Sequence, residues 1–352
     1  SKPLMSGLTN VCYSHDSDTL FFFFAEGEIL KAAEYSASVG DVIELQSIGT
    51  ITDGIAAVEM DPSEELISLV SNSNRLYLFS CGFGDLTLKS DLVLDGLVKG
   101  TEEVVSVGWG KKETQFHGSL GKSAALAKEI ILEKMVLGDD SKPRIAWRQD
   151  QHFCVSSCDA SRGVRSRKIR VFSPDGVMLS CSEPVNGLEW PLDWCNDVNV
   201  IASTQVNVKG QRQVIFFERN GFRHHEFTLS REELVRGLKW NPSGNLLALL
   251  YVDGTVQLWT SLNYHWYLKH ECRFEGADSI RFTADNQLLL SGKKLVTLDI
   301  SLSFTTCGPV LAVVDGNQLQ LTFTNSGLIP PPMCHESLSV GFVPNKVLVS
   351  ES

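Results

Sequence analysis

One stretch of the sequence has residue types that would suit phosphate binding. Residues 118–123, GSLGKS, supply a lysine and a serine hydroxyl after a glycine, as in the loop that holds the phosphates of a nucleotide. That loop also needs a glycine five positions before Gly121, where this chain has Phe116, and no buried strand precedes the stretch. We therefore expect residues 118–123 to form a solvated connection and not a nucleotide site.

Histidines and cysteines that could bind a metal occur close together at one place. His152, Cys154 and Cys158 are all even-numbered on an extended segment, so they share one face, but no second Cys or His pair follows at zinc-finger spacing. A core position on one strand face explains the two cysteines better, and His224 and His225 fit a polar turn. The metalloprotease pattern His-Glu-x-x-His and the hydrolase pattern Gly-x-Ser-x-Gly are absent. The sequence predicts no metal site and no cofactor.

Three carboxylates fall at equivalent positions of a repeated turn. Asp16, Asp61 and Asp285 each follow an aromatic or apolar residue and precede an apolar strand. Turn hydrogen bonds account for aspartates at such positions without acid–base chemistry. We therefore predict no catalytic residue and a protein that is not an enzyme. A propeller enzyme with a carboxylate or metal site in its axial channel is the alternative.

A basic cluster interrupts an otherwise acidic chain. The net charge is 31 − 42 = −11, which disfavours a dedicated nucleic-acid binder. The cluster lies between two predicted strands of one repeat and consists of Arg162, Arg165, Arg167, Lys168 and Arg170. Two interpretations stay open: a solvated hairpin, or a local contact for RNA phosphate or for an acidic partner.

The elements that must position these residues recur along the chain. An aromatic or apolar anchor, a turn rich in Asp, Pro, Ser, Gly or Asn, and an apolar strand follow one another, most clearly in residues 240–250, WNPSGNLLALL. Further copies begin near Tyr13, Met60, Trp147, Trp194 and Phe282. With Trp109 as one more anchor, the six intervals from Tyr13 to Phe282 average about 45 residues, close to the WD40 period. The pattern predicts an all-β, WD40-type β-propeller with seven blades, in which each four-stranded sheet stacks on its neighbours.

One segment departs from this pattern. Residues 122–136 are rich in Ala and Leu and have apolar and charged residues at helical spacing, which predicts a short helix inserted between blades. For the domains, we expect the propeller to occupy residues 1–335. Residues 336–352 would then be a closing strand or the start of a second propeller.

Composition sets the class of protein. The chain has 352 residues, 43% of them hydrophobic, which is enough for a sizeable core. Its nine cysteines are odd in number and scattered through apolar runs, so we expect reduced thiols and a location in the cytoplasm, with the nucleus as the alternative. No apolar run is long enough to cross a membrane. The chain begins with Ser1 and not with Met, so we expect it to be a piece of a longer protein.

Several longer stretches are similar to one known family. They include residues 107–118, VGWGKKETQFHG; residues 216–227, FFERNGFRHHEF; and residues 329–334, IPPPMC. Together with residues 167–172 and 256–269, they resemble the first WD40 propeller of the largest, scaffolding subunit of the Elongator complex. The resemblance covers roughly residues 104–336.

The resemblance implies a non-catalytic scaffold in a complex that modifies the wobble uridine (U34) of transfer RNA. Its implied partners are the other Elongator subunits, including the catalytic radical-SAM and acetyltransferase subunit and a second WD40 subunit, with tRNA contacted through the complex and no membrane. Dimerisation is expected through a C-terminal region that this chain lacks. The alternative is a propeller that contacts RNA directly through the basic cluster.

Two stretches contain more aromatic and polar residues than blade packing needs, residues 108–118 and 263–267. Mixed apolar area and polar tips are typical of interface anchors. The candidate partner contacts are therefore Trp109, Lys111, Lys112, Phe116, His117, His265 and Trp266. The alternative is that Trp109 and Trp266 fill gaps between blades.

Overall fold

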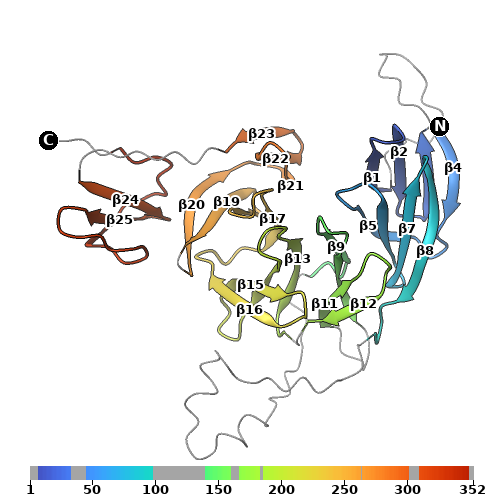
Figure 1. The fold of residues 1–352 in the computed structure, drawn as a ribbon, viewed down its shortest axis with the longest axis horizontal. Coiled ribbons are helices and arrows are strands. Elements are labelled where there is room, and N and C mark those ends of the chain that lie inside the picture. The colour runs from blue at the N-terminus through green and yellow to red at the C-terminus, as the bar shows by residue number, and fades with distance from the viewer. Residues whose placement is uncertain are drawn as a thin grey trace, which may run out of the picture.

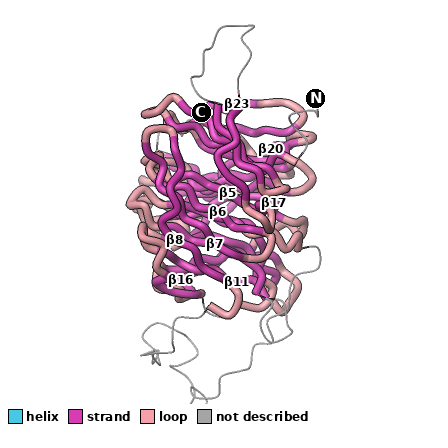
Figure 2. The backbone as a smooth tube through the Cα atoms, turned by 90° about the vertical axis from the view of Figure 1, so that its right-hand side faces the viewer, coloured by secondary structure: helices cyan, strands magenta, loops and turns pink. Residues whose placement is uncertain are grey.

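All regular elements that the structure describes are β-strands (Figures 1 and 2). The computed structural model describes residues 7–32, 45–97, 139–159, 166–182, 185–262, 264–300 and 309–348. The helix expected at residues 122–136 lies outside these ranges. Within them, no helix is both long and apolar enough to cross a membrane.

The strands form seven antiparallel sheets, and each sheet uses consecutive strands of the chain. The first three sheets have four strands each. Sheet A contains β1 (Leu8–Ser14), β2 (Thr19–Phe24), β3 (Glu28–Ala32) and β4 (Leu45–Thr50). Sheet B contains β5 (Ile55–Met60), β6 (Leu66–Ser71), β7 (Arg75–Gly82) and β8 (Asp85–Val93). Sheet C contains β9 (Arg144–Trp147), β10 (Phe153–Asp159), β11 (Ser166–Phe172) and β12 (Met178–Cys181).

Two more four-stranded sheets and two three-stranded ones follow. Sheet D contains β13 (Leu188–Trp194), β14 (Val200–Val206), β15 (Arg212–Glu218) and β16 (Arg223–Thr228). Sheet E contains β17 (Val235–Trp240), β18 (Leu247–Tyr251), β19 (Thr255–Leu262) and β20 (His265–Arg273). Sheet F contains β21 (Ala277–Phe282), β22 (Gln287–Gly292) and β23 (Val296–Asp299). Sheet G contains β24 (Val310–Asp315), β25 (Gln318–Phe323) and β26 (Glu336–Ser339).

Sheets A to F follow one another around an arc (Figure 1). The first strand of each sheet contacts the first strand of the next, in the series β1, β5, β9, β13, β17, β21. Sheet G contacts β20, the last strand of sheet E. This radial arrangement is that of propeller blades, which confirms the predicted fold class. The number of blades and the closure of the ring stay predictions, as does the domain boundary after residue 335, which falls immediately before β26.

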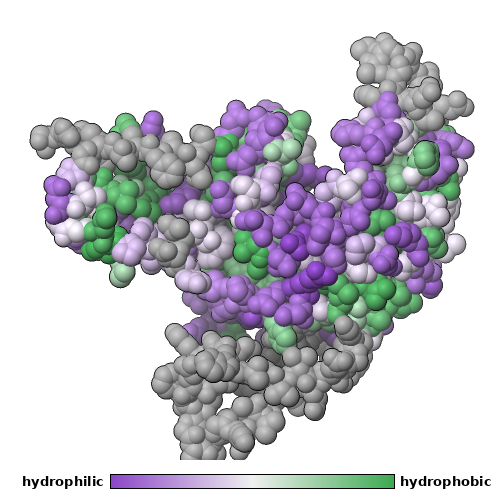
Figure 3. All heavy atoms as spheres, in the orientation of Figure 1, coloured by the Kyte–Doolittle hydropathy of each residue, from purple (hydrophilic) through white to green (hydrophobic). Residues whose placement is uncertain are grey.

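The hydrophobic core is divided among the spaces between neighbouring sheets. Phe21, Phe23 and Ile29 of sheet A pack with Val58 and residues of β6 from sheet B. Similar clusters join sheets B and C, C and D, D and E, and E and F. Sheets B to E are covered on both faces, and burying a Phe or Leu between two sheets stabilises the fold by about 2 kcal/mol per side chain. The space-filling view shows hydrophilic residues over much of the visible face of the central sheets (Figure 3).

Side chains of the first strands also bond to the neighbouring sheet. Asn10 donates to the backbone oxygen of Val58 (2.6 Å), and the Trp147 indole donates to that of Glu59 (3.1 Å). The Trp190 indole donates to the backbone oxygen of Arg236 (3.2 Å) in the same way. These bonds fix the relative positions of consecutive sheets near the inner edge.

Of the three turn aspartates, Asp61 forms the predicted turn hydrogen bonds. Asp61 is buried, and its carboxylate accepts hydrogen bonds from the backbone nitrogens of Ser63 (3.1 Å) and Leu66 (2.6 Å). Asn241 accepts the corresponding bond from the Leu246 nitrogen (2.9 Å). Both side chains close the turn between the first and second strands of their sheets, which is a structural role.

Candidate functional site

Two arginines of the predicted basic cluster are buried in ion pairs. Arg167, on β11, donates to both carboxylate oxygens of Asp139 (2.9 and 2.6 Å), and neither side chain is exposed to solvent. Arg170 is also fully buried and donates to Asp159 (3.0 Å), to the Ser157 hydroxyl (3.2 Å) and to the backbone oxygen of Leu97 (3.2 Å). The interpretation of these two cations as an exposed patch for RNA or an acidic partner was therefore wrong.

The physical reason is the stacking of the sheets. Side chains alternate between the two faces of β11, and neighbouring sheets cover both faces. Arg167 and Arg170 are therefore buried on opposite faces, and each needs an acidic partner. Lys168 retains partial exposure and lies 3.5 Å from an Asp159 oxygen. Arg162 and Arg165 lie outside the described residues.

His265 contacts another part of the same chain. Its Nε2 lies 2.8 Å from an Asp315 oxygen, at the place where β20 meets β24. The backbone nitrogen of Leu268 donates to the other Asp315 oxygen (3.2 Å), and Lys269 donates to the Val314 backbone oxygen (2.7 Å). His265 thus helps to hold sheet G against sheet E, and it keeps 39% side-chain exposure.

Trp266 packs between sheets D and E. Its ring stacks on Phe227 (4.7 Å between centroids) and on Phe216 (5.2 Å), and it lies at a tilt to Trp240. These contacts support the interpretation of Trp266 as a residue that fills an inter-blade gap. The other candidate partner contacts lie outside the described residues: Trp109, Lys111, Lys112, Phe116 and His117.

Two of the residues considered as metal ligands, Cys154 and His152, lie in different environments. Cys154 is fully buried, and burial raises the pKa of its thiol well above the ordinary value, which keeps it neutral. His152 lies instead beside Asp150, with 3.1 Å between Nδ1 and a carboxylate oxygen. In the described ranges, no group of three or more His, Cys, Asp or Glu side chains is placed to hold a metal ion.

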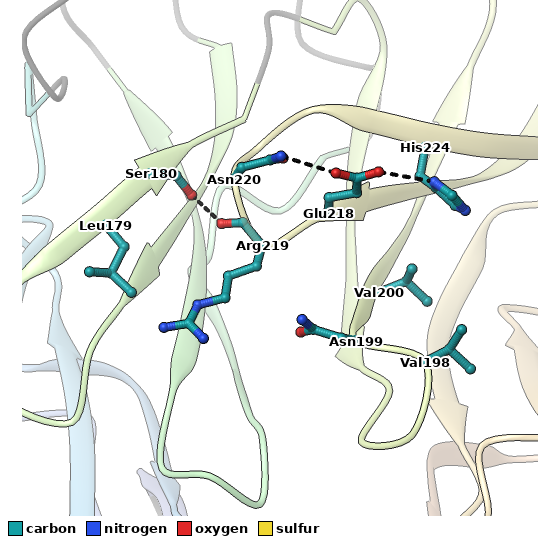
Figure 4. Close-up of a pocket in the computed structure, with 9 residues that line it drawn as sticks. All are labelled: Leu179, Ser180, Val198, Asn199, Val200, Glu218, Arg219, Asn220 and His224. Atoms are coloured by element: carbon teal, nitrogen blue, oxygen red, sulfur yellow. Dashed lines mark hydrogen bonds and ion pairs between the residues drawn. The ribbon is translucent and has the colours of Figure 1, made fainter. Parts of the chain in front are cut away.

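A groove between sheets C and D was missed by sequence reasoning. We call it the Arg219 groove; it has a volume of about 630 Å³ and is lined by Leu179, Ser180, Val198, Asn199, Val200, Glu218, Arg219, Asn220 and His224 (Figure 4). These residues come from three hairpins. They lie on strand β12 of the first, at the turn before β14 in the second, and at the turn between β15 and β16 in the third. An Asn-Gly pair such as Asn220-Gly221 is typical of a tight hairpin turn, but sequence spacing gave no sign that Val198 and Leu179 would face it.

Polar contacts organise one side of the Arg219 groove. Glu218 accepts a hydrogen bond from Asn220 (3.0 Å) and lies 3.2 Å from Nδ1 of His224. The Ser180 hydroxyl donates to the backbone oxygen of Arg219 (2.5 Å), which ties the β15–β16 turn to sheet C. The Arg219 guanidinium reaches Nε2 of His152 (2.5 Å). The groove therefore combines one cation, amide donors, apolar walls and one carboxylate, that of Glu218, which Asn220 and His224 contact.

Comparison with known proteins identifies a family. A family model described as the ELP1 first N-terminal beta-propeller matches residues 4–287. Elongator complex protein 1 of Mus musculus is 32% identical over 354 aligned positions, which cover 88% of this chain and 26% of the mouse protein. The protein of the same name from Saccharomyces cerevisiae is 32% identical over 366 positions, covering 90% of this chain and 27% of the yeast protein.

A third relative agrees. Elongator complex protein 1 of Schizosaccharomyces pombe is 34% identical over 315 positions, covering 84% of this chain and 24% of that protein. The chain thus spans about a quarter of the length of these relatives.

Proposed function

The chain belongs to the family of the ELP1 first N-terminal β-propeller, the Elongator complex protein 1 family, and from this membership we propose that it acts as a non-catalytic scaffold. In this proposal it is the propeller region of an Elongator subunit that holds other subunits in fixed relative positions. The complex then modifies the wobble uridine (U34) of tRNA, and the chemistry belongs to another subunit.

The observation that carries the proposal is the family match over residues 4–287, which covers sheets A to E and β21, the first strand of sheet F. A stack in which each sheet is joined to the next by an apolar cluster is stiff and presents loops at fixed positions. Stiffness of this kind suits the binding of several partners at once. The proposed partners are the radical-SAM and acetyltransferase subunit and a second WD40 subunit, with tRNA reached through the complex.

The test uses the full-length protein with an affinity tag. We expect it to co-purify with a subunit that binds acetyl-CoA, and we expect deletion of this propeller region to reduce that recovery. The isolated 352-residue chain should modify no tRNA when given S-adenosylmethionine and acetyl-CoA. Turnover by the isolated chain, or unchanged assembly after the deletion, would contradict the scaffold role.

A further inference from the structure

Arg219 differs from most other arginines that the structure describes. Ten of them lie at ion-pair distance from a carboxylate, namely Arg75, Arg144, Arg148, Arg167, Arg170, Arg212, Arg223, Arg231, Arg236 and Arg281. Within the described ranges, only Arg219 and Arg273 form no such pair, and Arg273 donates to the backbone oxygen of Asp253 (3.3 Å). Arg219 alone of these two lines a groove.

The contact of Arg219 with His152 leaves its charge uncompensated. A guanidinium only donates hydrogen bonds, so the lone pair on Nε2 of His152 must be the acceptor. The ring proton then resides on Nδ1, which faces Asp150 at 3.1 Å. This arrangement uses one hydrogen of the guanidinium and orients the group, and no further partner of the guanidinium lies among the described residues.

Asn199 supplies a second donor to the same space. Its side-chain oxygen accepts a hydrogen bond from the Trp194 indole (3.2 Å), so the amide NH₂ is turned away from that bond. Its backbone φ of +53° is one that asparagine tolerates better than most residues, and it sets the direction of the side chain. Figure 4 shows Asn199 and Arg219 among the residues that line the groove, with the Arg219 guanidinium extended toward the side on which Leu179 lies.

The walls and the surroundings select the kind of anion. Val198 is 57% exposed and faces the groove with Leu179 and Val200, so a ligand must bring an apolar group next to its negative charge. Glu218 and the net charge of −11 oppose a long polyanion such as RNA. A guanidinium matches the planar carboxylate of an amino-acid side chain, to which it can donate two parallel hydrogen bonds.

We propose that the Arg219 groove binds the Asp or Glu side chain of a partner polypeptide, with apolar neighbours of that residue on Leu179 and on Val198, which lie at opposite sides of the groove (Figure 4). This inference rests on the proposed scaffold function but is tested separately. Recovery of subunits tests the scaffold with the full-length protein, whereas the groove is tested with defined peptides on the 352-residue chain.

The experiment selects short random peptides displayed on phage against the chain, with counter-selection against Arg219→Gln. We expect enrichment of peptides in which an acidic residue adjoins an apolar one. For a selected peptide, fluorescence anisotropy should show a dissociation constant raised about tenfold or more by Arg219→Gln, as the loss of a charge-assisted hydrogen bond predicts. The matched control Arg273→Gln should leave it unchanged.

A second variant approaches the groove from the opposite wall. Val198→Glu changes an exposed side chain, adds a negative charge and should also weaken the peptide without unfolding the chain, as circular dichroism would verify. Equal peptide binding by wild type and Arg219→Gln, or no acidic enrichment, would overturn the proposal. So would Arg219-dependent binding of a single-stranded RNA oligonucleotide in place of the peptide.

Discussion

Arg212 and Glu189 form an ion pair in the interior of sheet D. Glu189 is fully buried on β13, and Arg212 on β15 donates to both of its oxygens at 2.9 to 3.1 Å. Arg212→Met would leave a buried carboxylate without this cation. We expect the free energy of unfolding, measured with urea, to fall by about 3–5 kcal/mol.

The double variant Arg212→Met, Glu189→Met is the control for this pair. Removing both charges should recover much of the loss, because the cost comes mainly from the carboxylate left without its partner. A double variant as unstable as Arg212→Met would show that packing, and not charge, carries the effect.

The thiol of Cys12 predicts a pH dependence of stability. Burial raises its pKa from 9.0 to about 12. Above pH 9 the unfolded chain loses the Cys12 proton while the folded chain keeps it, so stability is complete below about pH 9 and is lost as the pH rises toward 12. Urea unfolding between pH 8 and 11 should show this decline. Cys12→Ala should make the decline shallower, and an unchanged slope would contradict the assignment.

Residue types predicted chemistry at the Arg167 to Arg170 cluster but not its exposure. A run of Arg and Lys residues occurs both in solvated hairpins and in buried ion pairs. Only the positions of Asp139 and Asp159 in three dimensions distinguish these two cases. Asp61 was predictable because its partners, Ser63 and Leu66, are close in sequence. Local bonds can be read from spacing, and long-range pairs cannot.

Turns join strands within each sheet, and some accept no side chain. Gly254, between β18 and β19, has φ +83°, and a Cβ there would lie 2.2 Å from the backbone oxygen of Phe274. Gly254→Ala should therefore lower the unfolding free energy by more than the roughly 1 kcal/mol of a left-handed alanine alone. Gly210 is the matched control, because it has φ +78° and open space around it. Equal melting-temperature losses for the two variants would contradict the steric argument.

Packing between elements can be tested at Trp266. Its indole fills the space between sheets D and E, so Trp266→Ala should cost about 3–5 kcal/mol of unfolding free energy. Trp266→Phe should retain part of the stacking on Phe227 and Phe216. A Trp266→Ala protein of wild-type stability that fails to recruit a partner would restore the interface interpretation.

At the scale of the whole molecule, the repeat period predicted the blade-like sheets and their order. The turn pattern predicted where strands begin, but the period is not regular throughout: sheets B and C are neighbours although their anchors, Met60 and Trp147, are 147 − 60 = 87 residues apart, so the blade counted from Trp109 does not lie between them. The Arg219 groove was not predictable, because its residues come from three separate hairpins in two sheets. The contact of sheet G with β20 was not predictable either, because it depends on long-range pairs such as His265 with Asp315.

Because each sheet packs mainly on its neighbours in sequence, the fold also predicts which sheets a destabilising substitution affects first. Phe23 is buried between sheets A and B, so Phe23→Ala should loosen those two sheets first. Hydrogen exchange read by mass spectrometry should rise in β1 to β8 while β17 to β20 keep their protection. Uniformly faster exchange throughout the chain would mean that the sheets unfold together.

The use of consecutive strands in every sheet has a consequence for biosynthesis. Each sheet is built from one continuous piece of chain, and each of sheets B to F packs against the sheet that precedes it in the sequence. A strand of sheets A to F can therefore pair before any distant segment is translated. The nascent polypeptide can fold sheet by sheet during translation. Apolar surface is then left open mainly at the growing end, which limits the time during which that surface can aggregate.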